Sequence, residues 1–288
     1  MAQVRPHRED SSSVPYEQEV RQGDRFSFGE NWRTFLSSIN DQRIKEAETS
    51  LKRMLEVDDL EGKSFLDVGS GSGLFSLVAR RLGARVHSFD YDMSSVWCTN
   101  ELRRRYFADD PDWKIEHGSA LDLDYLKSLG QFDVVYSWGV LHHTGDMWQA
   151  VDAVTTLVRP NGGKFFIAIY NDQGMKSKAW GRVKKLYCSL PSMVRPLLLI
   201  PSAMFLWGPE AIRDCVKLRP FQTMINYHRR RGMSVWSDLI DWVGGYPFEV
   251  ARPEAIFEFF RERGFSLRKL RTVGGGLGCN EFVFVRKN

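Results

Sequence analysis

Three glycines spaced two residues apart form the most informative chemical pattern in the 288-residue sequence. Gly69, Gly71 and Gly73 follow an apolar run that ends at Asp67, and a helical pattern begins directly after them. A loop without side chains lets its backbone approach a ligand, and amide groups near a helix N-terminus favour a carboxylate. A dinucleotide-binding loop would have the spacing GxGxxG. Because the third glycine here comes one residue earlier, no pyrophosphate is expected.

A second acidic residue lies at the end of the next predicted strand. Asp90 closes the run RVHSFD, seventeen residues after Gly73, and a carboxylate there can accept hydrogen bonds from both hydroxyls of a ribose. The two segments together predict a site for S-adenosylmethionine (SAM), with Asp67 near the ammonium group of its methionine part. The alternative is structural: a tight turn between strand and helix, and a solvated strand end.

The stretch Gly62–Tyr170, and more weakly the last forty residues, resembles the class I SAM-dependent methyltransferases, in the group of small-molecule and quinone methylases. The resemblance implies a Rossmann-like fold, SAM as cofactor, S-adenosylhomocysteine as product and no metal. It assigns the family's adenine segment to Gly118, Ser119 and Ala120, with Asp122 close behind. The family often has Asp where this chain has Ser119, so the adenine contact differs there.

The expected cofactor contacts come from four strand ends. They are Asp67, Gly69, Ser70, Gly71, Gly73, Asp90, Tyr91, Ser119, Ala120, Ser137 and Trp138. The last two belong to FDVVYSWGVLHHTGD, which is similar to the family's segment that passes under the sulfonium and leads into the substrate pocket. This segment lacks the Asn/Asp-Pro-Pro-aromatic stretch of methyltransferases that act on DNA bases or glutamine, so methylation of those amines is disfavoured.

Two adjacent histidines are the best candidates for a general base. An imidazole titrates near neutral pH, so His142 or His143 could take the proton of a hydroxyl that attacks the methyl group. Tyr170, at the end of a predicted strand, and Tyr246, in a turn, are further catalytic candidates at the same edge. The alternative is that the histidines only pack locally, because SAM is already activated and alignment of the reacting atoms supplies much of the acceleration.

Apolar runs that alternate with helical patterns predict the elements that carry these residues. They indicate a doubly wound, Rossmann-like α/β fold with a seven-stranded sheet, an antiparallel last strand and a large helical insertion after the fifth strand. We expect a loose tail at 1–22, a helical cap at 23–60, the SAM-binding core at 61–170, the insertion at 171–251, and a final helix and hairpin at 252–288. The insertion starts at the ligand-binding edge of the sheet and can cover the acceptor as a lid. FSFGENW, early in the cap, is a second candidate lid.

The charge distribution bears on the partner. Between Asn171 and Val235 the sequence has twelve Lys or Arg but three Asp or Glu, in a chain of net charge +4. A basic lid suggests a small acceptor that is anionic or carrier-bound, or contact of Leu197–Trp207 with an anionic membrane surface. A solvated charged face is the alternative. The net charge is too small to predict a nucleic-acid partner.

The remaining features favour a cytoplasmic enzyme. The polar N-terminus lacks the apolar stretch of a signal peptide, and no apolar run reaches the ~20 residues needed to cross a bilayer. The four cysteines have no spacing typical of disulfides or a zinc site. We predict methylation of a small acceptor by direct displacement at the sulfonium, with oxygen preferred as the attacking atom. An RNA or protein methyltransferase and a non-catalytic SAM-binding module are the alternatives.

Overall fold

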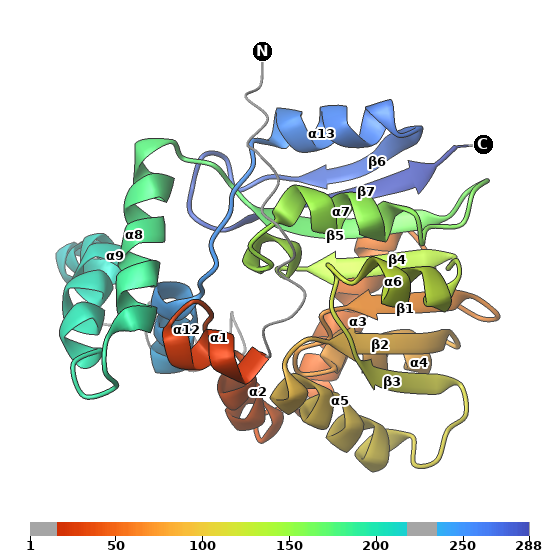
Figure 1. The fold of residues 1–288 in the computed structure, drawn as a ribbon, viewed down its shortest axis with the longest axis horizontal. Helices are drawn as coiled ribbons and strands as arrows, with labels where there is room; N and C mark the ends of the chain where they lie inside the picture. The colour runs from red at the N-terminus through yellow and green to blue at the C-terminus, as the bar shows by residue number, and fades with distance from the viewer. Residues whose placement is uncertain (1–15, 218–234, 288) are drawn as a thin grey trace.

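The structure is a computed structural model that describes residues 16–217 and 235–287. Its strands are β1 (Ser64–Val68), β2 (Arg85–Asp90), β3 (Trp113–His117), β4 (Val134–Trp138), β5 (Lys164–Tyr170), β6 (Phe265–Arg271) and β7 (Cys279–Arg286). They form one sheet in the order β3-β2-β1-β4-β5-β7-β6 (Figure 1). The first five are parallel, and β7 pairs antiparallel with β5 and β6. The predicted seven-stranded sheet with an antiparallel last strand is confirmed.

Helices cover both faces of the sheet, which is why its central strands are apolar on both sides. On one face lie α3 (Asp41–Leu55), α4 (Leu74–Arg81) and α5 (Met93–Tyr106), and on the other lie α6 (Leu123–Leu129), α7 (Met147–Thr155) and α13 (Pro253–Glu262). In β5, five consecutive residues, 165–169, are buried. Because β1 to β5 are parallel, their carboxyl ends meet at one edge, where ligands bind in sheets of this kind.

The predicted insertion consists of helices beyond that edge. α8 (Met175–Ser189), α9 (Pro196–Val216) and α12 (Val235–Gly244) stand past the carboxyl ends of the parallel strands (Figure 1). They share a small core of their own, made of Trp180, Tyr187, Cys188, Leu199, Leu239 and Val243 together with Phe26 from near the N-terminus. Four of the twelve cations counted in this region, Arg219 and Arg229–Arg231, lie outside the described residues.

The N-terminal region differs from the expected loose tail at 1–22. Residues 1–15 lie outside the described part, but Tyr16–Gln22 form helix α1, and Gly29–Leu36 form α2. Tyr16 holds α1 against the core. Its hydroxyl donates a 2.6 Å hydrogen bond to Asp92, and its ring centroid lies 5.4 Å from that of Tyr91. These partners are more than seventy residues away, so no local pattern indicates them.

Candidate cofactor and acceptor site

The glycine loop between β1 and α4 has a backbone shape that requires glycine. Gly69, Gly71 and Gly73 have φ angles of 78°, 55° and 79°, in the left-handed region that side chains disfavour. A Cβ atom on Gly73 would also lie 2.8 Å from the Cα of Thr99 in α5, closer than real Cβ contacts. The loop is therefore built for close backbone approach, as the spacing predicts.

Several amides of this loop already have partners. The amides of Gly69 and Ser70 donate to the carbonyl of Phe89 at 2.9 and 3.1 Å, and that of Gly73 donates to Ser70 at 2.8 Å. The amide of Gly71 donates to the carboxylate of Asp90 at 2.9 Å. These four donors are not available to a ligand carboxylate, which corrects the expectation for them.

Asp90 sits where the sequence places it, at the carboxyl end of β2 beside the loop. One carboxylate oxygen accepts from Gly71, and the other accepts from the amide of Asp92 at 2.9 Å. Burial raises the pKa of Asp90 to about 6. Each oxygen can accept more than one hydrogen bond, so both could still receive ribose hydroxyls.

Asp67 is deeply buried, with only 2% of its surface exposed. Its carboxylate accepts a hydrogen bond from the hydroxyl of Ser76 in α4, and burial raises its pKa to about 7. Ser76 in turn lies 2.7 Å from the hydroxyl of Ser88 in β2. No local sequence pattern indicates this buried series of polar side chains, and the placement of Asp67 near a ligand ammonium stays a prediction.

Three other predicted cofactor residues line the same edge. The Ser70 hydroxyl lies 2.9 Å from that of Thr99, and the Ser137 hydroxyl donates to the carbonyl of Val68 at 3.2 Å. Trp138 donates from its indole nitrogen to Glu281 of β7 at 3.2 Å and leaves 44% of its surface exposed. Trp138 is thus an open apolar surface at the end of β4.

The remaining predicted cofactor residues lie around the ends of β2 and β3. The Tyr91 ring contacts that of Tyr16 edge-on, with 5.4 Å between the ring centroids, and stacks on that of His117 at 6.0 Å. Ser119 accepts from the amide of Leu121 at 3.1 Å through its hydroxyl, and Ala120 is buried in the core. Their roles toward adenine stay predictions.

An N-terminal strap, residues 16–36, crosses this edge from the cofactor loop to the insertion. The Trp32 ring lies against Gly71, where a Cβ would come within 3.1 Å of it. The amide of Gly29 donates to Asp92 at 2.8 Å, and Asn31 donates to Asp241 of α12 at 2.5 Å. Figure 1 shows α1 and α2 between α5 of the core and α12 of the insertion. The candidate lid FSFGENW therefore does cover the glycine loop.

The two histidines lie in a short 3₁₀ helix, η2 (Leu141–His143), that follows β4. The ring of His142 lies 4.4 Å from that of His143 and 4.1 Å from that of Tyr170 at the end of β5. Val140, two residues before His142, packs against Gly69. The structure thus brings three of the four catalytic candidates together, close to the glycine loop.

The environments of the two histidines differ. His143 Nδ1 lies 2.6 Å from the carbonyl of Pro247, and burial lowers its pKa to about 3. His142 is fully buried. Neither of its ring nitrogens has a hydrogen-bond partner of acceptable geometry among the described residues, although a contact with the Ala168 carbonyl raises the pKa of the ring against the larger effect of burial. Burial lowers the pKa of His142 well below its usual value. Both rings are therefore neutral at neutral pH.

Tyr246, the fourth catalytic candidate, is placed differently. Its carbonyl accepts a 2.8 Å hydrogen bond from the amide of Phe26, and its side chain packs with the insertion core. No ring contact joins it to the histidines in the described part of the chain. Its contacts are those of a residue that fastens the strap.

A buried lysine next to Tyr170 was not anticipated. Lys184 of α8 donates to the carbonyl of Trp242, and its Nζ lies 4.7 Å from the ring centroid of Trp242, 4.8 Å from that of Phe248 and 5.8 Å from that of Tyr170. Burial lowers its pKa to about 7. In the sequence it is one of several cations in KSKAWGRVKK, and nothing local separates it from the exposed ones.

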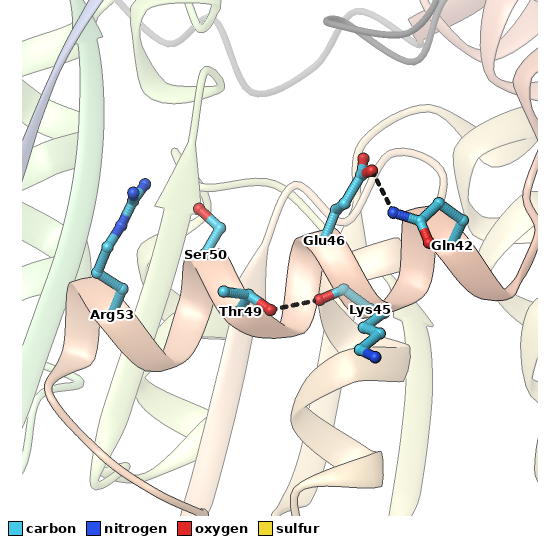
Figure 2. A pocket seen from close by; sticks show the side chains of 6 residues that line it. All are labelled: Gln42, Lys45, Glu46, Thr49, Ser50 and Arg53. Atoms are coloured by element: carbon cyan, nitrogen blue, oxygen red, sulfur yellow. Dashed lines mark hydrogen bonds between the residues drawn. The ribbon is translucent and has the colours of Figure 1, made fainter.

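A hollow on the surface of α3 lies elsewhere. It is lined by Gln42, Lys45, Glu46, Thr49, Ser50 and Arg53, all from one exposed helix face (Figure 2). Gln42 donates to Glu46 at 2.7 Å and Thr49 to the carbonyl of Lys45 at 2.8 Å, so these polar groups satisfy one another. We assign no function to it.

Two features are absent from the described residues. No helix among them combines the length and the apolar character needed to cross a membrane. No group of three or more His, Cys, Asp or Glu side chains within residues 16–217 and 235–287 could hold a metal ion.

The residues at the edge of the sheet fit SAM on two observations. The cradle at residues 69–73 has no room for side chains, and a half-buried carboxylate, that of Asp90, stands beside it and bonds to the loop. These residues could hold the methionine and ribose parts of the cofactor.

Comparisons with known proteins give the same indication. A methyltransferase domain family matches residues 39–237. Ubiquinone biosynthesis O-methyltransferase of Brucella ovis is 33% identical over 120 residues, which make up 39% of this chain and 43% of that protein. Ribosomal protein L11 methyltransferase of Prochlorococcus marinus is 39% identical over 82 residues, 28% of this chain and 27% of that protein. The similarity thus spans less than half the length of these curated relatives.

A solved structure shows the fold over a larger share of the chain. Magnesium protoporphyrin IX methyltransferase from Synechocystis, with bound S-adenosylhomocysteine, superposes with a TM-score of 0.56 at 13% identity, and the match covers 94% of this chain and 99% of that one. The family match covers more than half of the chain, and the sheet order and the glycine loop agree with it. The chain therefore belongs to the class I SAM-dependent methyltransferases.

Proposed function

We propose that this methyltransferase acts on a hydroxyl group of a small, partly aromatic acceptor, and that His142 receives the hydroxyl proton. The observation that carries the proposal is the fully buried imidazole of His142: neither of its nitrogens makes a hydrogen bond of good geometry with a described residue, although the carbonyl of Ala168 is near enough to influence its pKa. Leaving a buried polar group unpaired costs free energy, about 1 to 3 kcal/mol. A substrate hydroxyl that pairs with it would remove that cost.

The surroundings of His142 favour an aromatic acceptor. Tyr170 contacts both histidines, and the rings of Trp242 and Phe248 each lie 5.3 Å from that of Tyr170. Phe28 of the strap adds a ring 4.9 Å from that of His143. Aromatic side chains prefer edge-to-face or offset contacts with other rings. His142 is fully buried, so the acceptor reaches it only after these covering rings move.

The protein itself has to bind the hydroxyl, accept its proton and align the reactants. When bound, SAM supplies a methyl group on a sulfonium, which becomes the neutral thioether S-adenosylhomocysteine as the hydroxyl oxygen takes the methyl. His142, neutral because of its lowered pKa, holds the hydroxyl by its hydrogen and accepts the proton that oxygen loses. His143 is fixed by Pro247 and serves to position the η2 turn. The strap and the insertion exclude water and align the reactants.

The relatives support the choice of oxygen. The Brucella ovis protein is named an O-methyltransferase of ubiquinone biosynthesis, and it is similar to this chain over 120 residues. The relative named for ribosomal protein L11 matches a shorter stretch, so a protein acceptor is the second candidate. Within this proposal, the positive charge of the insertion further predicts that the acceptor is anionic or bound to a carrier.

The test is transfer of a radiolabelled methyl group from SAM to a panel of catechols, simple phenols, sugars, RNA and ribosomal protein. We expect a phenol or catechol to be labelled, and the His142→Gln variant to lose roughly 10²-fold or more in kcat while its affinity for SAM is unchanged. His143→Gln should instead lose thermal stability, because it gives up the bond to Pro247.

Two outcomes would overturn the proposal. Labelling of RNA or protein without any small acceptor would assign a macromolecular substrate, and full kcat in His142→Gln would remove the histidine from the proton transfer. Binding of SAM without turnover on any acceptor would favour a non-catalytic module.

A further inference from the structure

The helices of the insertion expose an apolar stripe to solvent. It consists of Met193, Leu197, Ile200, Met204, Phe205 and Ile212, whose exposed fractions range from 60% to 91%. Met193 lies just before α9, and the other five lie within it at successive spacings of three, four, one and seven residues, which keeps them on one broad side of the helix. Residues 196–209 contain no charged side chain. Outside the segment 175–212, the most exposed large apolar side chains in the described residues are Met93 and Trp236, at 53% each. The stripe is therefore the main apolar surface that the described chain leaves uncovered.

A cationic face accompanies the stripe on the neighbouring helix. Lys176, Lys178, Arg182 and Lys185 of α8 are all exposed, and α8 has no Asp or Glu. None of the four forms an ion pair with a described residue. The two helices are in contact, since the ring of Phe205 on the stripe lies 5.9 Å from that of Trp180 in α8. The apolar stripe and four exposed cations without a described ion-pair partner are thus carried by two helices that pack against each other.

The presence of both an apolar stripe and exposed cations indicates which kind of partner this surface binds. A partner protein with an apolar groove would not require the cations, and a second copy of this chain would bring one cationic face near another. A lipid bilayer with anionic headgroups matches both parts, because the apolar side chains enter the acyl boundary while lysines and arginines meet the phosphates. No described helix is suited to crossing the bilayer, so the contact would be made from one side.

We propose that the stripe and the cationic face dock the enzyme onto an anionic membrane surface, with α9 lying in the plane of the headgroups. The insertion stands beyond the carboxyl edge of the sheet, so docking would place the acceptor side of the enzyme near the lipid (Figure 1). The proposal concerns a surface apart from the reaction site. It does not depend on which acceptor is methylated.

The experiment is flotation of the purified full chain with two kinds of vesicle, phosphatidylcholine alone and phosphatidylcholine mixed with phosphatidylglycerol. The wild type should float with the mixed vesicles and much less with the neutral ones, and high salt should weaken the binding, because exposed charges are screened. Leu197→Asp/Met204→Asp should lower the bound fraction by roughly tenfold or more. Arg182→Glu/Lys185→Glu should abolish the preference for the anionic vesicles.

Matched control variants show whether a lower bound fraction reflects lost membrane contact or lost folding. Leu123→Asp/Leu277→Asp changes two exposed leucines outside α8 and α9, and Arg81→Glu/Lys127→Glu reverses two exposed cations there. Both should float like the wild type, and melting followed by circular dichroism should show all four variants folded. The proposal is overturned if the wild type does not float with the mixed vesicles, or if the Leu197→Asp/Met204→Asp variant floats equally well. It is also overturned if sedimentation shows a dimer that this variant dissociates.

Discussion

Asp90 is the residue on which the account of cofactor binding depends most directly. Its carboxylate already holds the amides of Gly71 and Asp92, and its buried position raises its pKa to about 6. The ionised form is the one that can accept two hydroxyl hydrogens from a ribose. Proton binding and cofactor binding therefore compete at this side chain.

The prediction for Asp90→Asn follows from that competition. At pH 8 the variant should bind SAM more weakly by about 1 to 3 kcal/mol, because charge-assisted hydrogen bonds are lost. As the pH falls through 6, the wild-type carboxylate itself becomes protonated, so the difference between the two proteins should shrink. Calorimetric titration at several pH values measures it, and equal affinities at pH 8 would refute the placement of the ribose.

Lys184 gives a second prediction, on stability. An unfolded lysine keeps its proton up to about pH 10.4, whereas the folded protein releases the proton of Lys184 near pH 7. Between these values the unfolded chain binds more protons, so stability should rise with pH, by at most ~1.4 kcal/mol per unit. Lys184→Met should remove that part of the rise between pH 7 and 8.5 in denaturant unfolding, and Lys185→Met, the exposed neighbour, should keep it. An unchanged slope in Lys184→Met would show that the lysine is not neutral when folded.

At the scale of elements, the N-terminal strap joins parts that are distant in sequence. Arg25 donates to the carbonyls of His143 and Thr144 at 2.8 and 3.2 Å, while Trp32 lies on the glycine loop. The strap thus touches both the cofactor cradle and the turn that carries the histidines.

Loss of the Arg25 contacts should loosen this strap. Arg25→Ala should speed hydrogen exchange of amides in residues 16–36 and raise the Kd for SAM roughly fivefold, equivalent to about 1 kcal/mol. Arg21→Ala, on the exposed side of α1, serves as the matched control and should behave like the wild type. Identical exchange in both variants would mean that Arg25 does not hold the strap.

The strands and the glycine loop could be predicted because their signals are local. Apolar runs of strand length alternate with helical patterns, and glycine spacing reports backbone shape directly. The different roles of His142 and His143 could not be predicted, because they depend on the carbonyl of Pro247, about a hundred residues away. For the same reason α1, the pairing of Asp67 with Ser76 and the burial of Lys184 were missed: each depends on contacts between elements, which no local pattern reports.

In the whole molecule, the five parallel strands bring their carboxyl ends to one edge of the sheet, and the insertion and the strap cover that edge. The family supplies this arrangement, and the same scaffold serves many acceptors. In this chain the cover contains an aromatic cluster around Tyr170, a buried lysine and an apolar stripe on the outside. Variants of the insertion and the strap are therefore the ones that should change the choice of acceptor, whereas variants of the glycine loop should change cofactor binding.

The most direct test of the central claim is calorimetric titration of the purified protein with SAM, S-adenosylhomocysteine and NAD in parallel. We predict binding of both sulfur-containing ligands with Kd values on the order of micromolar, about −8 kcal/mol, and no binding of NAD. Binding of NAD alone, or of none of the three, would contradict the assignment of the glycine loop and Asp90 to SAM.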